Sequence, residues 1–474
     1  MQTGPTLSDP FAYHPKSFHI PWYNTPMIRR LTSLLLALVL LTGCTLPANL
    51  LETFGMAPTA TQPPQPTASR TLPGAAPNPS TPSDPGASPS PMATRSSGPP
   101  VLTLWVPPEF DPDAGTLAGD LLHARLEEFS RLNNNVEVRV RVKSTSGPGG
   151  LLESLTASAA AAPLAMPSVV ALPRTDLETA ALKGLIYPLD GSSTVIDEQD
   201  WYDYARALAM VQGATFALPF AGDSLVIAYR PSRVVAAPAD WETVYRLGQP
   251  MAFPAGDTQS LFVLSLYQSV GGIVEDAQRR PTLQPEVLSR VLQVIADGEQ
   301  RGIFPYWLSQ YETPAQVWQA YQDGRINALV TWSSAFLGTL PPDTAAVPIP
   351  ALDDTPMSLA TGWGWAIADP LPERRVLSIR LAEFLADGQF LARWTEAAGY
   401  MPTRPSSLAA WSNQSLKTLL SPIAVSAQAR PSVDQLVGLG PVLKEATLKV
   451  MKRESDPTQA AQLAVERLAV PETR

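Results

Sequence analysis

Regular patterns of apolar and polar positions begin near residue 101 and continue toward the end of the chain. Four valines at alternate positions, separated by charged residues, predict a strand over residues 136–142 with one apolar face. Before it, a short apolar run over 101–106 predicts another strand, and apolar residues at helical spacing predict a helix that includes residues 122–132. Strand, helix and strand in this order indicate a βαβ unit with parallel strands.

The same alternation of helices and strands extends through the rest of the chain and predicts the α/β class. Further helices are predicted over 151–162, 176–183, 260–270, 285–299, 314–323, 372–386 and 388–398, with a mostly helical tail over 432–469. Further strands are predicted over 168–172, 215–219, 224–229, 326–332 and 364–368. The helix over 314–323 is the best delimited. Thr313 can cap it, Pro314 suits its first position, and Gly324 can adopt the left-handed conformation after its end.

The segment before residue 101 has a different pattern. Arg29 and Arg30 precede an apolar run over 31–41, which has the length of a signal-peptide core and is too short to span a bilayer. The run ends in Leu-Thr-Gly-Cys, with the only cysteine of the chain at position 44, a pattern typical of a lipidation site. We therefore predict a signal peptide over 27–43 and lipidation of Cys44. The alternative is a buried structural cysteine after an ordinary signal anchor.

The residues on either side of this signal segment are also distinctive. Residues 1–26 contain five prolines and no cationic start directly before an apolar stretch, so we predict that translation starts at Met27 and that 1–26 is a start-site extension. Residues 44–100 are rich in Pro, Ser, Thr, Ala and Gly, and cannot bury enough apolar surface to offset the entropy of ordering. We predict that they form a disordered stalk between the lipidated cysteine and the folded body.

Composition narrows the classes of function. The formal net charge of −9 comes from 34 basic and 43 acidic residues that are interspersed without a basic cluster, which argues against a nucleic-acid partner. About 370 residues remain from position 101, enough for two domains with their own cores. No second apolar stretch approaches transmembrane length. We expect no cofactor. We also expect no histidine-rich metal site, because the chain has only three histidines.

Several segments, taken in order, resemble the extracellular solute-binding proteins of bacterial ABC importers, in the carbohydrate-binding branch that includes maltose-binding protein. The likeness lies in residues 183–190 (KGLIYPLD), 219–223 (PFAGD), 323–332 (DGRINALVTW), 362–367 (GWGWAI) and 399–404 (GYMPTR). Ser168 and Arg230 depart from the family pattern, which usually has Asp and Asn at these positions.

The resemblance implies a two-lobe periplasmic-binding-protein-like fold with a hinge and an interlobe cleft. The expected N-terminal lobe comprises 101–222 and 363–400, and the expected C-terminal lobe comprises 223–362 and 401–474. Crossings between the lobes are expected near residues 221–225 and 359–363 and near Met401. The implied function is capture of a small hydrophilic solute, a sugar, by a monomer anchored at the extracytoplasmic face of the membrane, with delivery to an ABC permease.

A sugar site needs aromatic platforms and planar polar side chains, and four residues near the expected crossings fit this need. Trp332 ends a predicted strand, where α/β sheets bind ligands, and the resemblance also implies a stacking aromatic there. Trp363 and Trp365 flank a glycine at the second crossing, and alternation points both to one face. Asp223 matches a family position that can hold a sugar-binding carboxylate. The alternative for the tryptophans is core packing, and the alternative for Asp223 is a turn residue beside Gly222.

Two weaker ligand candidates follow strands of the N-terminal half. Trp105 ends the first predicted strand, with core packing as the alternative. Arg174 follows the third, with a solvated loop as the alternative.

Two other functions are also compatible with the sequence. The first is a hydrolase that cleaves carbohydrates with paired carboxylates, since the separation of acidic side chains is invisible in the sequence. A Ser-His-Asp site would have to use His123, which we expect at the surface or at the margin of a helix. The second is a structural or sensory lipoprotein that kept the fold without a ligand.

Overall fold

The computed structural model describes residues 101–353 and 357–469 of the chain. Its helices and strands alternate as predicted, which confirms the α/β class. Among the described residues, nine strands form one mixed sheet with the path β2-β1-β3-β10-β6-β8-β7, in which β11 also pairs with β10 and β9 with β6. We use "first lobe" for the elements around β1 to β3 and "second lobe" for those around β7 to β9.

The first lobe begins with the predicted βαβ unit, and β1 is parallel to both β2 and β3. β2 lies at the edge of the sheet, so its alternating valines are only partly covered. The elements of this lobe are β1 (Val101–Val106), η3 (Pro108–Phe110), α2 (Leu117–Leu132), β2 (Glu137–Val142), α3 (Leu151–Ala161), η4 (Pro163–Ala165), β3 (Val169–Pro173), α4 (Arg174–Leu182), η5 (Val195–Asp197), α5 (Asp203–Ala209), β4 (Met210–Val211), β5 (Ala214–Thr215), α11 (Pro372–Leu385), α12 (Gly388–Ala398) and α13 (Pro405–Ala409).

The second lobe packs helices around β8, which is parallel to β7. Its elements are α6 (Trp241–Tyr245), β7 (Met251–Ala252), α7 (Leu261–Ser269), α8 (Pro285–Gln300), η6 (Tyr306–Gln310), α9 (Pro314–Gln322), β8 (Ala328–Trp332), α10 (Ser333–Leu337), β9 (Ala345–Pro348), α15 (Val433–Met451) and α16 (Pro457–Ala469). The predicted limits of α9 are confirmed. Thr313 and Gln316 form a capping box, Pro314 is the first helical residue, and Gly324 has a φ of 73°.

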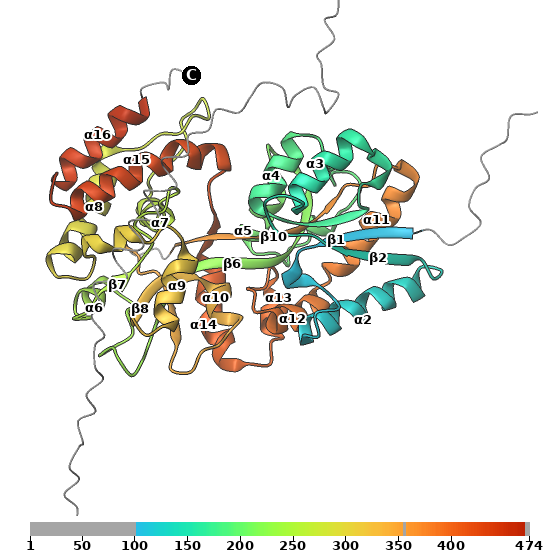
Figure 1. Cartoon of the computed structure of the whole chain (residues 1–474), viewed down its shortest axis with the longest axis horizontal. Helices are drawn as coiled ribbons and strands as arrows, with labels where there is room; N and C mark the ends of the chain where they lie inside the picture. Colours follow the sequence, from blue (N-terminus) through green and yellow to red (C-terminus); the bar gives the residue numbers. More distant parts are fainter. Residues whose placement is uncertain (1–100, 354–356, 470–474) are drawn as a thin grey trace, which may run out of the picture. The chain divides into compact units, whose positions relative to one another are not determined.

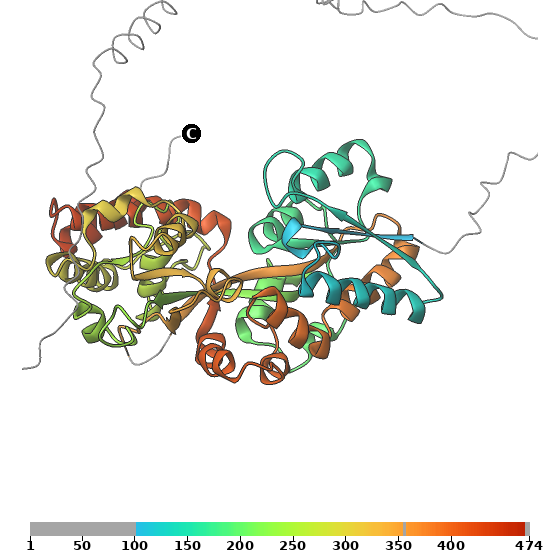
Figure 2. The same ribbon diagram turned by 60° about the horizontal axis from the view of Figure 1, so that its bottom comes forward.

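Two antiparallel strands, β6 (Ala217–Tyr229) and β10 (Ser358–Ile367), belong to both lobes (Figure 1). Figure 2 shows them, in green and orange, continuing from one group of elements into the other. We predicted two strands separated by residues 221–223, and this was wrong, because β6 is one continuous buried strand. Gly222 is not a turn residue. It pairs with Gly362 on one edge of β6 and with Met401 on the other, and a side chain at position 222 would overlap the Tyr204 hydroxyl.

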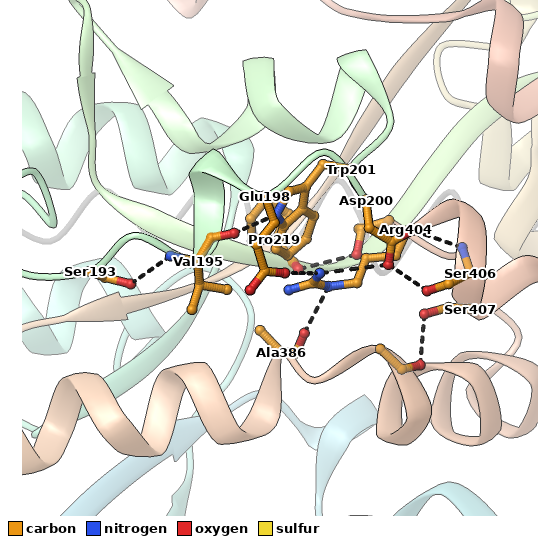
Figure 3. A network of polar contacts seen from close by, with 12 residues as sticks. Ser193, Val195, Glu198, Asp200, Trp201, Pro219, Ala386, Arg404, Ser406 and Ser407 are labelled. Carbon is orange, nitrogen blue, oxygen red and sulfur yellow. Dashed lines mark hydrogen bonds and ion pairs between the residues drawn. The ribbon is translucent and has the colours of Figure 1, made fainter.

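The chain remains part of the first lobe beyond Met401, where we expected it to enter the second lobe. Arg404 is buried, its guanidinium lies 3.8 Å above the ring of Trp201, and it donates hydrogen bonds to Glu198 at 2.7 Å and to the Ala386 carbonyl at 3.0 Å (Figure 3). All of these partners belong to the first lobe. The chain then passes through α14 (Gln414–Ser426) to β11 (Ala427–Ala429), which pairs with the start of β10. The last crossing therefore ends at β11.

A close backbone contact joins α12 of the first lobe to α10 of the second. Gly399 ends α12 with a φ of 71°, and a Cβ at this position would lie 2.5 Å from the Cα of Gly338. Gly324 ends α9 with a similar φ of 73°, but a Cβ there would meet no atom within 4 Å.

These two glycines give a matched test of the contact. We expect Gly324→Ala to lower the free energy of unfolding by about 1 kcal/mol, because of the left-handed backbone alone. Gly399→Ala should lower it by a further 1–3 kcal/mol or so, because the methyl group overlaps a backbone that cannot move freely. Urea unfolding measures both values, and equal losses would contradict a tight contact between α12 and α10.

Candidate functional site

The two strands that join the lobes, β6 and β10, carry several of the predicted binding residues on one face. In the antiparallel register, Asp223 of β6 is opposite Thr361 of β10, and Ala221 is opposite Trp363. Residues that are directly opposite share a face, and so do residues two apart on one strand. Trp363, Thr361 and Asp223 therefore point to the same side of the sheet.

The other edge of β6 adds two more aromatic side chains to this face. Trp332, the last residue of β8, is opposite Leu225. Tyr400 precedes Met401, which pairs with Gly222, so Tyr400 lies across from Asp223. Trp332, Trp363 and Tyr400 are all half-buried. The positions of β6 opposite the two tryptophans are four residues apart, which corresponds to about 13 Å along the strand.

Phe110 is the buried member of this aromatic group, only 2% exposed, and supports the rings of Trp363 and Tyr400 from within the first lobe. It lies in η3, directly after β1, and its ring is 4.9 Å from the ring of Trp363 and 5.5 Å from that of Tyr400, both in edge-on geometry. Our sequence analysis did not assign Phe110 or Tyr400. The available signal was the place of Phe110 just after a strand, at the carboxyl edge of the sheet. We call Phe110, Trp332, Trp363 and Tyr400 the aromatic face.

Asp223 is buried at the centre of this face, and its carboxylate contacts the beginning of α10. Oδ1 accepts hydrogen bonds from the Ser333 hydroxyl at 2.7 Å and from the Ser334 backbone N–H at 2.9 Å, and Oδ2 accepts one from the Ser334 hydroxyl. The alternative that Asp223 is a turn residue is wrong, because it lies within β6. Burial raises the pKa of the Asp223 carboxyl to about 6, although these hydrogen bonds act in the opposite direction.

The charged groups near Tyr400 are carboxylates. Burial raises the pKa of the Tyr400 phenol, and the carboxylates of Asp223 and Glu109 raise it further, while a hydrogen bond with Trp363 acts against them. Glu109 is exposed and accepts a hydrogen bond from the Thr145 hydroxyl at 2.9 Å. Tyr400 is therefore a neutral phenol, which can both donate and accept hydrogen bonds.

Two of the predicted tryptophans lie in the core of the first lobe. Trp365 is 1% exposed and stacks on Phe220, with 4.0 Å between the ring centres. Trp105 is 2% exposed and packs in a cluster with Val170 and Leu172. Both positions agree with the core alternative, and neither ring belongs to the aromatic face.

Arg174 is also buried, so the alternative of a solvated loop residue is wrong. It begins α4, and its guanidinium donates hydrogen bonds to the carbonyls of Leu208 at 2.9 Å and Met210 at 2.6 Å. A salt bridge of 2.6 Å joins it to Glu178. Its guanidinium is thus engaged by partners within the protein, and Arg174 lines a small cavity together with Trp363.

The remaining predictions concern catalytic groups, metal ligands and the N-terminal segment. His123 is exposed, with its ring nitrogens 3.4 Å from Asp113 and 3.5 Å from Glu127. In the described part of the chain, no group of three or more His, Cys, Asp and Glu side chains is placed to hold a metal ion. None of the helices over 101–353 and 357–469 combines the length and apolar character of a membrane span. Cys44 lies outside the described residues.

Comparison with known proteins assigns this arrangement to a family. A family model described as bacterial extracellular solute-binding protein matches residues 124–418. The chain belongs to this family. It is accordingly a solute-binding protein rather than an enzyme, and the family is extracellular. The predicted resemblance to extracellular solute-binding proteins is confirmed. In sequence, no curated protein matches this solute-binding protein significantly.

Solved structures share the fold of this solute-binding protein. The sugar-binding protein MalE from Xanthomonas citri has a TM-score of 0.63 at 17% identity, covering 78% of this chain and 96% of that chain. The GacH receptor of Streptomyces glaucescens, solved unliganded and with acarbose, has a TM-score of 0.58 at 18% identity, covering 78% and 97%. UgpB from Mycobacterium tuberculosis, in complex with glycerophosphocholine, has a TM-score of 0.57 at 16% identity, covering 79% and 98%. The predicted two-lobe periplasmic-binding-protein-like fold is confirmed.

The raised pKa of Asp223 predicts an unusual dependence of stability on pH. Its folded value of about 6 exceeds the ordinary value of 3.8, so between these values the folded state binds more protons than the unfolded state. The contribution of Asp223 to the free energy of unfolding should therefore fall as pH rises from about 4 to 6. Relative to Asp223→Asn, the wild-type protein should lose roughly 2–3 kcal/mol over this range.

Urea unfolding of both proteins at pH 4 and pH 7 measures this difference. Asp240 is the control. It is an exposed helix cap, and its hydrogen bond from the Thr243 backbone N–H lowers the pKa of its carboxyl. Asp240→Asn should change the pH dependence with the opposite sign. A difference between wild type and Asp223→Asn that stays constant from pH 4 to pH 7 would contradict a buried, pKa-shifted Asp223.

Proposed function

We propose that this protein is a membrane-tethered lipoprotein that captures a small hydrophilic solute, a sugar, outside the cytoplasmic membrane and delivers it to an ABC importer. The observation that carries this proposal is the aromatic face. Its residues come from both lobes: Phe110 and Trp363 from the first, Trp332 from the end of β8 in the second, and Tyr400 from the crossing.

The chemistry of the aromatic face suits a sugar. A pyranose ring has apolar C–H faces that stack on indole and phenol rings, and hydroxyls at its edge that bond to planar polar groups. Tyr400 provides a neutral hydroxyl, which can donate to and accept from the sugar hydroxyls. The solved structures of similar fold named for sugar binding, such as MalE from Xanthomonas citri, support the same class of ligand.

The mechanism requires binding and lobe movement but no covalent chemistry. A ligand that contacts Trp363 and Trp332 at once has more contacts when the lobes are closed, so it shifts the open and closed populations by that difference in affinity. The paired strands β6 and β10 join the lobes and would absorb the rotation at the Gly222–Gly362 pair. The monomer would then present its closed form to the permease.

The strongest test of this site is removal of Trp332, the aromatic side chain that the second lobe contributes. Trp332→Ala should weaken sugar binding by about 2 kcal/mol or more, roughly thirtyfold, because a buried aromatic anchor contributes this much. Trp307→Ala is the control, since Trp307 is a 43% exposed side chain in η6 and does not belong to the aromatic face. Calorimetric titration of maltose, maltotetraose and tagatose measures both variants.

The outcome separates the proposed function from its alternatives. Equal affinities of Trp332→Ala and wild type, with an intact fold, would remove Trp332 from the site. If the wild-type protein binds none of a wide panel of sugars, polyols, sugar phosphates and peptides, the proposal fails in favour of a ligand-free structural or sensory lipoprotein. Release of shortened oligosaccharides during incubation would favour the hydrolase instead.

The membrane anchor is a separate prediction. If Cys44 is lipidated, cells fed a radiolabelled fatty acid should label the wild-type protein and retain it in the membrane fraction. Cys44→Ser should abolish the label and release the protein, because the acyl chains are lost, while sugar affinity stays unchanged. A control substitution beside it, Thr45→Ser, should keep both label and retention. Labelling of Cys44→Ser would contradict this prediction.

A further inference from the structure

The contacts of Asp223 join a crossing strand to the residues that follow Trp332. Its carboxylate binds Ser333 and Ser334, which are the first two residues of α10, and Trp332 is the N-cap of the same helix. The Ser224 backbone N–H adds a bond of 3.1 Å to the Ser333 hydroxyl. Two successive residues of β6 thus hold the two residues after Trp332.

These contacts are buried and involve a charge. Asp223 is 8% exposed and Ser333 is 1% exposed, so water competes little for their hydrogen bonds. Hydrogen bonds to a carboxylate are roughly twice as strong as those between neutral groups. Trp332 itself is only half-buried, with an extended backbone at φ −76° and ψ 142°. The direction of its side chain therefore depends on two constraints, its pairing with Leu225 in the sheet and the position of the start of α10.

The same contacts leave Asp223 little capacity for a ligand. An ionised carboxylate has about four acceptor positions, and three are occupied by Ser333 and Ser334. We propose that Asp223 is a positioning residue that holds Trp332 in its ligand-binding orientation through Ser333 and Ser334. This inference rests on the proposed function, because it assumes that Trp332 contacts the solute.

The energetic reason is preorganisation. Ordering a large side chain during binding lowers the affinity, and a site that already holds its ring in place avoids this loss. Loss of the contacts at the start of α10 would leave the Trp332 ring more mobile before the ligand arrives. Affinity would then fall by up to about tenfold, although the ring itself is still present.

The experiment labels the ligand-free protein with 5-fluorotryptophan and follows the fluorine NMR signal of Trp332, which is assigned with Trp332→Phe. Three variants are compared: Asp223→Ala, Asp223→Asn, and the double variant Ser333→Ala with Ser334→Ala. We expect the Trp332 signal to shift and broaden in Asp223→Ala and in the double serine variant. Asp223→Asn keeps one acceptor oxygen, so its signal should lie closer to that of wild type. The signal of Trp307 should stay unchanged throughout.

Ser232 provides a matched control. Its backbone N–H donates to Asp343 at 3.0 Å and its hydroxyl also binds Asp343, which is the pattern of Ser334 with Asp223 at an exposed place in the second lobe. Ser232→Ala should leave the Trp332 signal as in wild type. If Asp223→Ala does not fold, as judged by circular dichroism, the serine variants and Asp223→Asn still decide the result.

Maltose affinity then distinguishes positioning from direct contact. Positioning predicts that the double serine variant binds up to about tenfold more weakly, and that the serine substitutions have no further effect in Trp332→Ala. Direct ligand contact by Asp223 predicts weaker binding only in the Asp223 variants. An unchanged Trp332 signal in the double serine variant overturns the inference. Failure of the wild type to bind any sugar overturns the proposed function instead, and the NMR result in the ligand-free protein remains interpretable.

Discussion

The structure depends on the antiparallel pairing of β6 with β10, because these two strands carry the sheet from one lobe into the other. Gly222 and Gly362 are opposite each other at this point. A side chain on Gly222 would overlap Tyr204, and one on Gly362 would lie 2.4 Å from the Ala221 carbonyl oxygen. Two glycines allow both strands to continue with paired backbone groups while helices pack closely against them.

This pairing also explains why the binding residues come together. A sheet presents alternate residues on each face, so the register of β6 with β10 and β8 fixes which side chains can meet. Trp363, Asp223 and Trp332 lie far apart in the sequence but share one face. A one-residue slip of either pair would send a tryptophan to the opposite face. Strand register, rather than loop conformation, therefore defines the proposed ligand-binding surface.

The buried carboxylate of Asp223 adds a polar constraint at the same place. Its desolvation is unfavourable, as the raised pKa indicates, and three hydrogen bonds from α10 offset part of that cost. An apolar residue of similar size would avoid the cost but would leave the donors of Ser333 and Ser334 without an acceptor. The hydrogen-bonded carboxylate therefore favours one arrangement of β6 and α10. We propose that this arrangement holds the Trp332 ring in its ligand-binding orientation.

The sequence by itself determined the local elements and the class of fold. Thr313, Pro314 and Gly324 mark the limits of α9 through interactions within a few residues, and alternating valines mark β2. Only the tertiary structure decided which aromatic rings lie on the aromatic face, because the pairing of β10 with β6 shifts register between Trp363 and Gly364, and Trp363 and Trp365 pack against different rings. It also decided that β6 continues through Gly222, since the partner strands that extend it are distant in sequence. Burial and strand pairing are properties of the assembled sheet, and no local signal encodes them.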